Sequence, residues 1–446
     1  MKRGRTSAGK TATRRNFAAA LGPGLIFAGA SVGVSHLVQS TRAGAGWGLA
    51  LWFVILLALV LKYPPLSFGA RYSAATGQSL LEGYRRLGRG ALWLFAVLTI
   101  VTMFAVQAAV TIVTAALLDN RLQAWGIGSP GIGWLNVFLL GGCACLLLVG
   151  GYRWLDRFTK LLVPLFTVLT IIAAVAVLPH LGGVADTFWP TMSTWETAGT
   201  VAFLAALIGW MPTAIDLAAW QSLWVLERGR TQDARPSVRS AMLDFNIGYV
   251  CTGVLAFCFL VLGAGTISMC MAFPTSGTKF PGFFIDMYAA TVGDWAGGVV
   301  AIAALGVMLS TTVAVLDGFP RVIAVLVQRF RAPEGASGFE RSPAATATSS
   351  GRGLYVSAMV VVGGGALLLL QVMGNAFLPM VDLATIASFL TAPALAMLNH
   401  RVVTSSDMPD KTRLSGGLRI WSWLSIVSLA AFAIFYVVYR IDASMG

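Results

Sequence analysis

One polar segment interrupts the first apolar run of the chain, which begins near Leu25. The interrupting residues are glycines, serines and a histidine, at Gly29, Ser31, Gly33, Ser35 and His36. A membrane helix broken there leaves backbone groups without helical partners, which is tolerated at bilayer depth only beside a cavity or inside protein. We therefore expect Gly33 to mark a break and Ser35 and His36 to contact a substrate. The alternative for His36 is a structural hydrogen bond between helices.

A second interruption contains Gly209 and Pro212, with Met211 directly before the proline. Pro212 lacks an amide hydrogen and prevents the helix from continuing normally, so Gly209 and Pro212 predict a second break. Thr213 adds a hydroxyl there, and Asp216 adds a carboxylate one turn further on. A carboxylate inside a membrane span is costly and is a functional hypothesis by default. The alternatives are packing for Met211 and pairing with a basic residue of another helix for Asp216.

Together, the two breaks hold ligands that suit a metal ion. Imidazole, thioether and carboxylate groups favour a soft or borderline divalent ion, so His36, Met211 and Asp216 form a candidate metal site. Paired interrupted helices in a polytopic chain are the sequence mark of a transporter's substrate site. The chain contains no HExxH, GxSxG or P-loop motif. The sequence therefore indicates a carrier of a small solute or ion and not an enzyme, with no resident cofactor.

The elements that position these residues are membrane-spanning helices. Of the 446 residues, 57% are hydrophobic and only 11% are charged. Apolar segments of about 20 residues, each long enough to cross a bilayer, recur along the chain. The predicted spans are 17–41, 46–63, 90–118, 131–150, 160–180, 199–226, 245–268, 296–323, 354–373, 376–398 and 419–440. The sequence thus predicts an all-α polytopic membrane protein with one transmembrane domain, 17–440.

The 31 lysine and arginine residues outnumber the 18 acidic residues, which gives a net charge of +13, and they gather in short clusters between alternate spans. This alternation is the positive-inside pattern, so the basic excess reports topology and not nucleic-acid binding. We expect the plasma (inner) membrane, a cytoplasmic N-terminus and, because the span count is odd, a C-terminus outside. Residues 1–16 are predicted to form a cytoplasmic basic tail, and 328–353 a flexible cytoplasmic linker. The oligomeric state stays open.

Spans one to five (about 17–180) and six to ten (about 199–398) make two blocks that start on opposite sides of the membrane. Each block begins with an interrupted helix, which is the pattern of an inverted repeat of 5+5 helices, followed by an extra helix at 419–440.

Two further carboxylates have structural interpretations. Asp317 lies four residues before Arg321, the spacing of an intrahelical ion pair. Asp244 begins span seven, and its negative charge is expected to interact with the positive N-terminal end of that helix's dipole.

Several segments carry a family resemblance. They are GPG at 22–24, AGAGWG at 43–48, GARYSAATGQSLLEGYR at 69–85, GYRWLDRFTKLLV at 151–163 and Met-Pro at 211–212. With them, the chain resembles NRAMP-type transporters over nearly all of 17–440. The resemblance implies a LeuT-like fold of two inverted five-helix repeats. It also implies proton-coupled import of divalent transition metals such as manganese and iron.

The chain departs from the family at the motifs themselves. The family's Asp-Pro-Gly-Asn motif falls on residues 33–36, Gly-Val-Ser-His, so the metal-binding carboxylate is absent. The histidine of the Met-Pro-His motif is replaced by Thr213. The acidic residues of the family's third helix correspond to Met103 and to Val106 or Gln107. These replacements imply rewritten metal and proton sites.

Three hypotheses follow. The first is a secondary transporter that moves a divalent metal cation by alternating access, with atypical metal and proton sites. The second is a carrier of a non-metal polar organic solute or an anion. Half-helix N-termini favour anionic groups, and the serine, threonine and histidine side chains at the breaks are hydrogen-bonding partners. The third is a transport-inactive membrane sensor. The substrate, the coupling ion and the direction of transport stay open at this point.

Overall fold

The computed structural model describes residues 22–182, 184, 188–190, 198–231, 235–274, 279–331 and 349–445. These residues form helices and connecting turns without a β-strand, as the apolar pattern predicts. The helices are α2 (Pro23–Ser31), α3 (Thr41–Trp47), α4 (Trp52–Thr76), α5 (Leu80–Leu87), α6 (Arg89–Ala124), α7 (Ile132–Val177), α8 (Ala198–Trp210), α9 (Leu217–Thr231), α10 (Val238–Ser268), α11 (Phe280–Val292), α12 (Asp294–Arg331), α13 (Ser349–Val372), α14 (Phe377–Thr404) and α15 (Gly416–Met445). A π-helix, η1 (Ser35–Ser40), precedes α3, and short 3₁₀ turns occupy η2 (Leu178–His180) and η5 (Asp410–Thr412).

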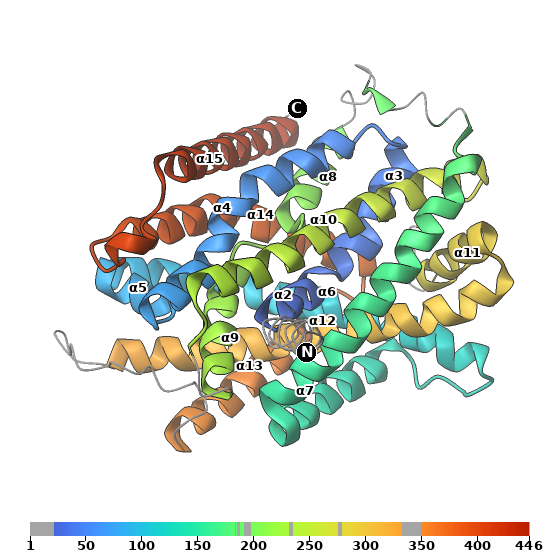
Figure 1. Cartoon of the computed structure of the whole chain (residues 1–446). Coiled ribbons are helices and arrows are strands. Elements are labelled where there is room, and N and C mark those ends of the chain that lie inside the picture. The colour runs from blue at the N-terminus through green and yellow to red at the C-terminus, as the bar shows by residue number, and fades with distance from the viewer. Residues whose placement is uncertain are drawn as a thin grey trace, which may run out of the picture.

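Two of the predicted spans are broken helices, as expected. The first consists of α2 followed by η1 and α3, and the sixth consists of α8 and α9. In Figure 1, α2 lies in the middle of the molecule among α10 and α12, while α15 lies at the edge beside α4. Within the described residues, nine stretches are long and apolar enough to cross a membrane. The chain is therefore a multi-pass membrane protein; the inverted relation of its halves stays a prediction.

Some boundaries differ from the prediction. Spans four and five lie mostly in one continuous helix, α7; the two apolar stretches are 132–150 and 159–180, and the second ends in η2. Helices occupy both ends of the predicted linker 328–353, because α12 continues to Arg331 and α13 begins at Ser349. The rest of that linker and the basic tail 1–16 lie outside the described residues.

Helix α4 extends thirteen residues beyond the predicted end at residue 63, through the consecutive prolines Pro64 and Pro65. Prolines inside a helix leave two carbonyls without their usual amide donors, four residues upstream. Here helix α15 supplies both donors: Trp421 Nε1 donates to Val60 O at 2.9 Å, and Ser425 Oγ donates to the carbonyl of Leu61. The extra eleventh helix thus stabilises the proline-containing segment of α4.

The broken first helix packs along α10 through glycines. A Cβ atom on Gly24 would lie 2.0 Å from the Asp244 carbonyl oxygen, and one on Gly248 would lie 2.1 Å from the Gly24 carbonyl oxygen. A Cβ on Gly44 would lie 2.1 Å from Leu260 O. Small residues let helix backbones approach this closely. Helix α10 is therefore the surface that fixes both halves of the first helix.

Asp244 does not interact with the N-terminus of its own helix, α10, as the sequence suggested. It lies six residues after the first residue of α10, too far inside to face the dipole of its own N-terminus. Its carboxylate instead accepts hydrogen bonds from the backbone amides of Gly22 at 3.0 Å and Gly24 at 2.8 Å. Asp244 thus caps α2, because tertiary packing brings the open N-terminus of that helix against α10.

Candidate functional site

The first break lies between Ser31, the last residue of α2, and the π-helix that begins at Ser35. A hydroxyl from α12 lies beside its carbonyls: Thr311 Oγ1 is 2.8 Å from Gly29 O and 3.2 Å from Val32 O, and its single hydrogen can be donated to either. A Cβ atom on Gly33 would lie 2.8 Å from Thr311 Oγ1, so this approach requires a glycine. The predicted break at Gly33 is present, and Thr311 holds it together.

The second break separates α8, which ends at Trp210, from α9, which begins at Leu217. Its free carbonyls are satisfied by a lysine from α4. Lys62 Nζ donates to Gly209 O at 2.7 Å and to Thr213 O at 2.9 Å. The Lys62 side chain is fully buried. The amino group of a lysine from a neighbouring helix therefore occupies the open C-terminal end of α8.

Asp216 lies directly before α9, and its carboxylate interacts with the Leu217 backbone amide. The residue is 6% exposed, and its Oδ2 atom is buried without a hydrogen-bond partner. The carboxylate also interacts electrostatically with the ammonium group of Lys62. Because an unpaired buried carboxylate oxygen is costly, Asp216 is a candidate to bind a cation or a hydrogen-bond donor.

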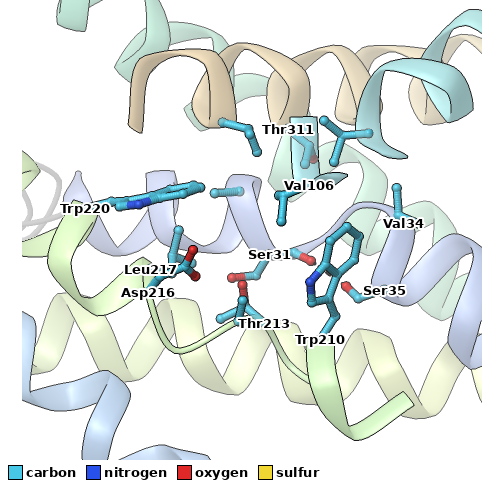
Figure 2. Close-up of a pocket in the computed structure, with 14 residues that line it drawn as sticks. Ser31, Val34, Ser35, Val106, Trp210, Thr213, Asp216, Leu217, Trp220 and Thr311 are labelled. Carbon is cyan, nitrogen blue, oxygen red and sulfur yellow. Dashed lines mark hydrogen bonds between the residues drawn. The ribbon is translucent and has the colours of Figure 1, made fainter. Parts of the chain in front are cut away.

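A cavity of about 30 Å³ lies between the two breaks, enough for about two water molecules. Its walls come from both broken helices and from α6 and α12 (Figure 2). The lining residues are Ala30, Ser31, Val34, Ser35, Val106, Val110, Trp210, Thr213, Ala214, Asp216, Leu217, Trp220, Thr311 and Val315. In Figure 2, the hydroxyl groups of Ser31 and Thr213 lie between the indole of Trp210 and the carboxylate of Asp216. The polar part of the cavity is thus one carboxylate with nearby hydroxyls.

Three of the six predicted substrate contacts line this cavity, namely Ser35, Thr213 and Asp216. Gly33, His36 and Met211 do not. The fully buried His36 ring is within 2.9 Å of Thr252 O through Nε2 and 2.7 Å of Ser35 Oγ through Nδ1.

Of the candidate metal set of His36, Met211 and Asp216, only Asp216 lines this cavity. Both ring nitrogens of His36 lie within hydrogen-bonding distance of other protein groups, the arrangement expected of a structural hydrogen bond between helices. Among the described residues, no cluster of three or more histidine, cysteine or acidic side chains could hold a metal ion. A metal at this site would have to be bound mainly by carboxylate and hydroxyl oxygens.

The structure also describes the surroundings of Gly209 and Pro212 at the second break and of the third predicted span. Gly209 is the second-last residue of α8, and a Cβ there would lie 2.1 Å from Thr385 O of α14. Pro212 lies inside the break, after a cis peptide bond. On α6, Val106 lines the cavity, whereas Gln107 Nε2 donates to Thr111 Oγ1 at 3.1 Å within its own helix. An apolar side chain therefore faces the cavity from the third predicted span.

Sequence reasoning did not single out Lys62. Its place at the end of predicted span two, 46–63, made it resemble an interfacial lysine, whereas the helix continues to Thr76 and places it mid-helix. The available signal was an ionisable residue followed by two prolines within a long apolar helix. Trp210 was also missed; its Nε1 donates to Ser388 Oγ at 2.8 Å, which fixes the ring against α14.

Comparison with known proteins gives consistent matches. A family model described as natural resistance-associated macrophage protein-like matches residues 24–439. An uncharacterised protein of Pasteurella multocida is 34% identical over 421 residues, covering 92% of this chain and 89% of that protein. The divalent metal cation transporter MntH of Staphylococcus aureus is 26% identical over 312 residues, covering 69% of this chain and 66% of that protein.

A solved structure agrees with the helix arrangement. The Eremococcus coleocola manganese transporter, in complex with an aromatic bis-isothiourea substituted compound, matches with a TM-score of 0.68. The match is 15% identical and covers 100% of this chain and 90% of that one. At this identity the likeness shows the fold, and it confirms the LeuT-like architecture with broken first and sixth helices.

Proposed function

Because the chain belongs to the natural resistance-associated macrophage protein-like (Nramp) family, we propose that it moves a divalent metal cation across the membrane by alternating access. Members of this family are transporters and not enzymes. The divalent metal named for the Staphylococcus aureus relative supports the same cargo class here. The observation that supports the proposal is the buried carboxylate of Asp216, which lines the cavity between the two breaks.

Asp216 has the chemistry and the position of a cation ligand. Its Oδ2 atom is buried, lacks a hydrogen-bond partner and belongs to a residue that lines the cavity between both broken helices. The family's first-helix carboxylate is missing from residues 33–36, so Asp216 would supply the negative charge from the other broken helix. A cation that enters the cavity would relieve the cost of the unpaired oxygen.

The donor set indicates which cations fit. The hydroxyl groups of Ser31, Ser35 and Thr213 lie around the cavity with Asp216, whereas the imidazole of His36 and the thioether of Met211 lie outside it. Carboxylate and hydroxyl oxygens suit hard ions such as manganese(II) and magnesium. We therefore infer a preference for these ions over cadmium, in place of the soft-ligand set expected from the sequence.

The membrane and the orientation of the chain are part of the same proposal. The alternation of basic clusters supports insertion in the plasma (inner) membrane, with the N-terminus in the cytoplasm. Coupling to protons is a separate question, tested by uptake into proteoliposomes. Uptake that rises with an imposed pH gradient would support proton symport. Uptake that is unchanged by the gradient would exclude proton coupling.

The direct test is calorimetric titration of the purified protein with manganese(II), magnesium and cadmium. We expect saturable binding of the first two and a loss of at least about tenfold in affinity in Asp216→Asn, roughly 1.4 kcal/mol. Asp286→Asn is the matched control, because Asp286 is exposed on α11, away from the cavity. Absence of saturable binding of every divalent ion by the unmodified protein would contradict the proposal.

A second candidate is a carrier of a polar organic solute or an anion. The specific observation in its favour is Lys62, whose ammonium group lies beside the break and offsets the charge of Asp216. A cavity with no net charge attracts a divalent cation less strongly than one with a carboxylate alone. Thermal stabilisation by a small organic solute, without any divalent metal binding, would favour this candidate.

A further inference from the structure

The buried head group of a lysine lies in the break between α8 and α9. Lys62 Nζ lies 2.7 Å from Gly209 O and 2.9 Å from Thr213 O, and its side chain is fully buried. In a continuous helix these two carbonyls would accept bonds from amides four residues later. Here the break removes those donors, and Leu217 N bonds to Ala214 O instead.

The charges on the two sides of the break match the ends of the two half-helices. The C-terminal end of a helix carries partial negative charge and the N-terminal end partial positive charge. Lys62 lies at the C-terminal end of α8, and Asp216 lies at the N-terminal end of α9. Each charge is therefore placed where the adjacent half-helix stabilises it, and the two offset each other across the break.

Unwound carbonyls at a half-helix C-terminus are the ligands with which transporters of discontinuous helices hold monovalent cations. We propose that the carbonyl pair of Gly209 and Thr213 is a monovalent-cation site that this protein fills with the ammonium group of Lys62. The lysine is a positioning residue that keeps the break in shape without a free ion from solution. Potassium and ammonium are the ions closest to its head group in size and bonding distance, so they are the natural replacements.

The proposal goes beyond metal transport and does not depend on it, because its readout is thermal stability without any divalent ion. Lys62→Ala vacates the head-group position and leaves room for a small cation. In this variant we expect potassium or ammonium, exchanged for N-methylglucamine at constant ionic strength, to raise the melting temperature by about 3 °C. N-methylglucamine is the reference because it is too large for the vacated space.

Two matched variants separate this effect from general salt effects. Lys62→Met fills the same space with an apolar chain, so it should be destabilised and should show no response to potassium or ammonium. Lys411→Ala removes an exposed lysine outside the helical core and should behave as the unmodified protein does. Equal responses of Lys62→Ala and Lys62→Met would overturn the proposal.

The unmodified protein supplies a further measurement that needs no variant. Its carbonyl site is already occupied, so its melting temperature should be the same in potassium, ammonium and N-methylglucamine salts. A rise of several degrees specific to potassium or ammonium in the unmodified protein would contradict a site filled by Lys62. Failure of divalent metal binding would leave both stability results unchanged, so the two proposals fail separately.

Discussion

Oδ1 of Asp317 lies 2.7 Å from Nη2 of Arg321, one turn further along α12, and both side chains are buried. The second carboxylate oxygen accepts from Arg321 Nε and from Trp224 Nε1 of α9, each at 3.0 Å. Tyr355 Oη of α13 donates to Oδ1 at 2.8 Å. The ion pair expected from the four-residue spacing is thus present, and it also joins three helices.

Removing one partner of this buried network should be strongly destabilising. Asp317→Ala leaves the buried charge of Arg321 with only the longer ion pair to Glu227, at 3.6 Å, and should cost about 3–5 kcal/mol. Asp382→Ala is the comparison, because its ion pair with Arg42, at 2.9 Å, is partly exposed and is worth at most about 1 kcal/mol. Thermal unfolding of the purified variants should show a much larger loss for Asp317→Ala. Equal losses of stability in the two variants would contradict the assignment of Asp317 as buried and Asp382 as partly exposed.

Close helix approach should make one glycine irreplaceable and another dispensable. In Gly44→Ala the new Cβ would lie 2.1 Å from Leu260 O and 2.6 Å from Ala264 N, backbone atoms that cannot yield without moving α10. We expect destabilisation of about 1–3 kcal/mol. Gly141→Ala in α7 meets nothing within 4 Å and should be stabilising by up to about 1 kcal/mol. Melting temperatures of the two variants check the prediction; a tolerated Gly44→Ala would refute this packing.

His36 and Met211 should matter for stability and little for cargo affinity. His36→Ala removes the interaction with Thr252 O inside the protein, which should cost about 1–3 kcal/mol. Neither residue lines the cavity, so manganese(II) affinity in His36→Ala and Met211→Leu should stay within about twofold, or 0.4 kcal/mol. Calorimetric titration measures the affinities. A loss of about tenfold in either variant would instead support the ligand set expected from the sequence.

The predicted membrane orientation can be checked with a native thiol. Cys270 is exposed and follows α10, in the connection that an N-terminus in the cytoplasm places outside. A membrane-impermeant maleimide should label it in intact cells. Cys145 is also exposed but lies in the apolar stretch 132–150, which the bilayer would cover. Cys270→Ser is the control and should abolish the labelling. Labelling of Cys270 only after permeabilisation would reverse the assigned orientation.

Both helix breaks could be predicted from sequence because their causes are local. Pro212 stops a helix through its own ring and missing amide hydrogen. Gly33 interrupts an apolar run with a residue that weakens helices. The orientation of side chains around each break could not be predicted in the same way. His36 and Ser35 are adjacent in sequence, yet Ser35 lines the cavity and His36 contacts Thr252 of α10.

The sequence by itself determined the membrane class, the two interrupted helices and the family, because hydropathy, proline and glycine act over a few residues. Tertiary structure decided which groups meet at the breaks. Lys62 and Thr213 are 151 positions apart, and only the packing of α4 against the broken helix brings that ammonium group to the free carbonyls. A buried backbone carbonyl takes whichever donor lies within reach. Its partner is therefore set by three-dimensional proximity and not by the residues beside it in the chain.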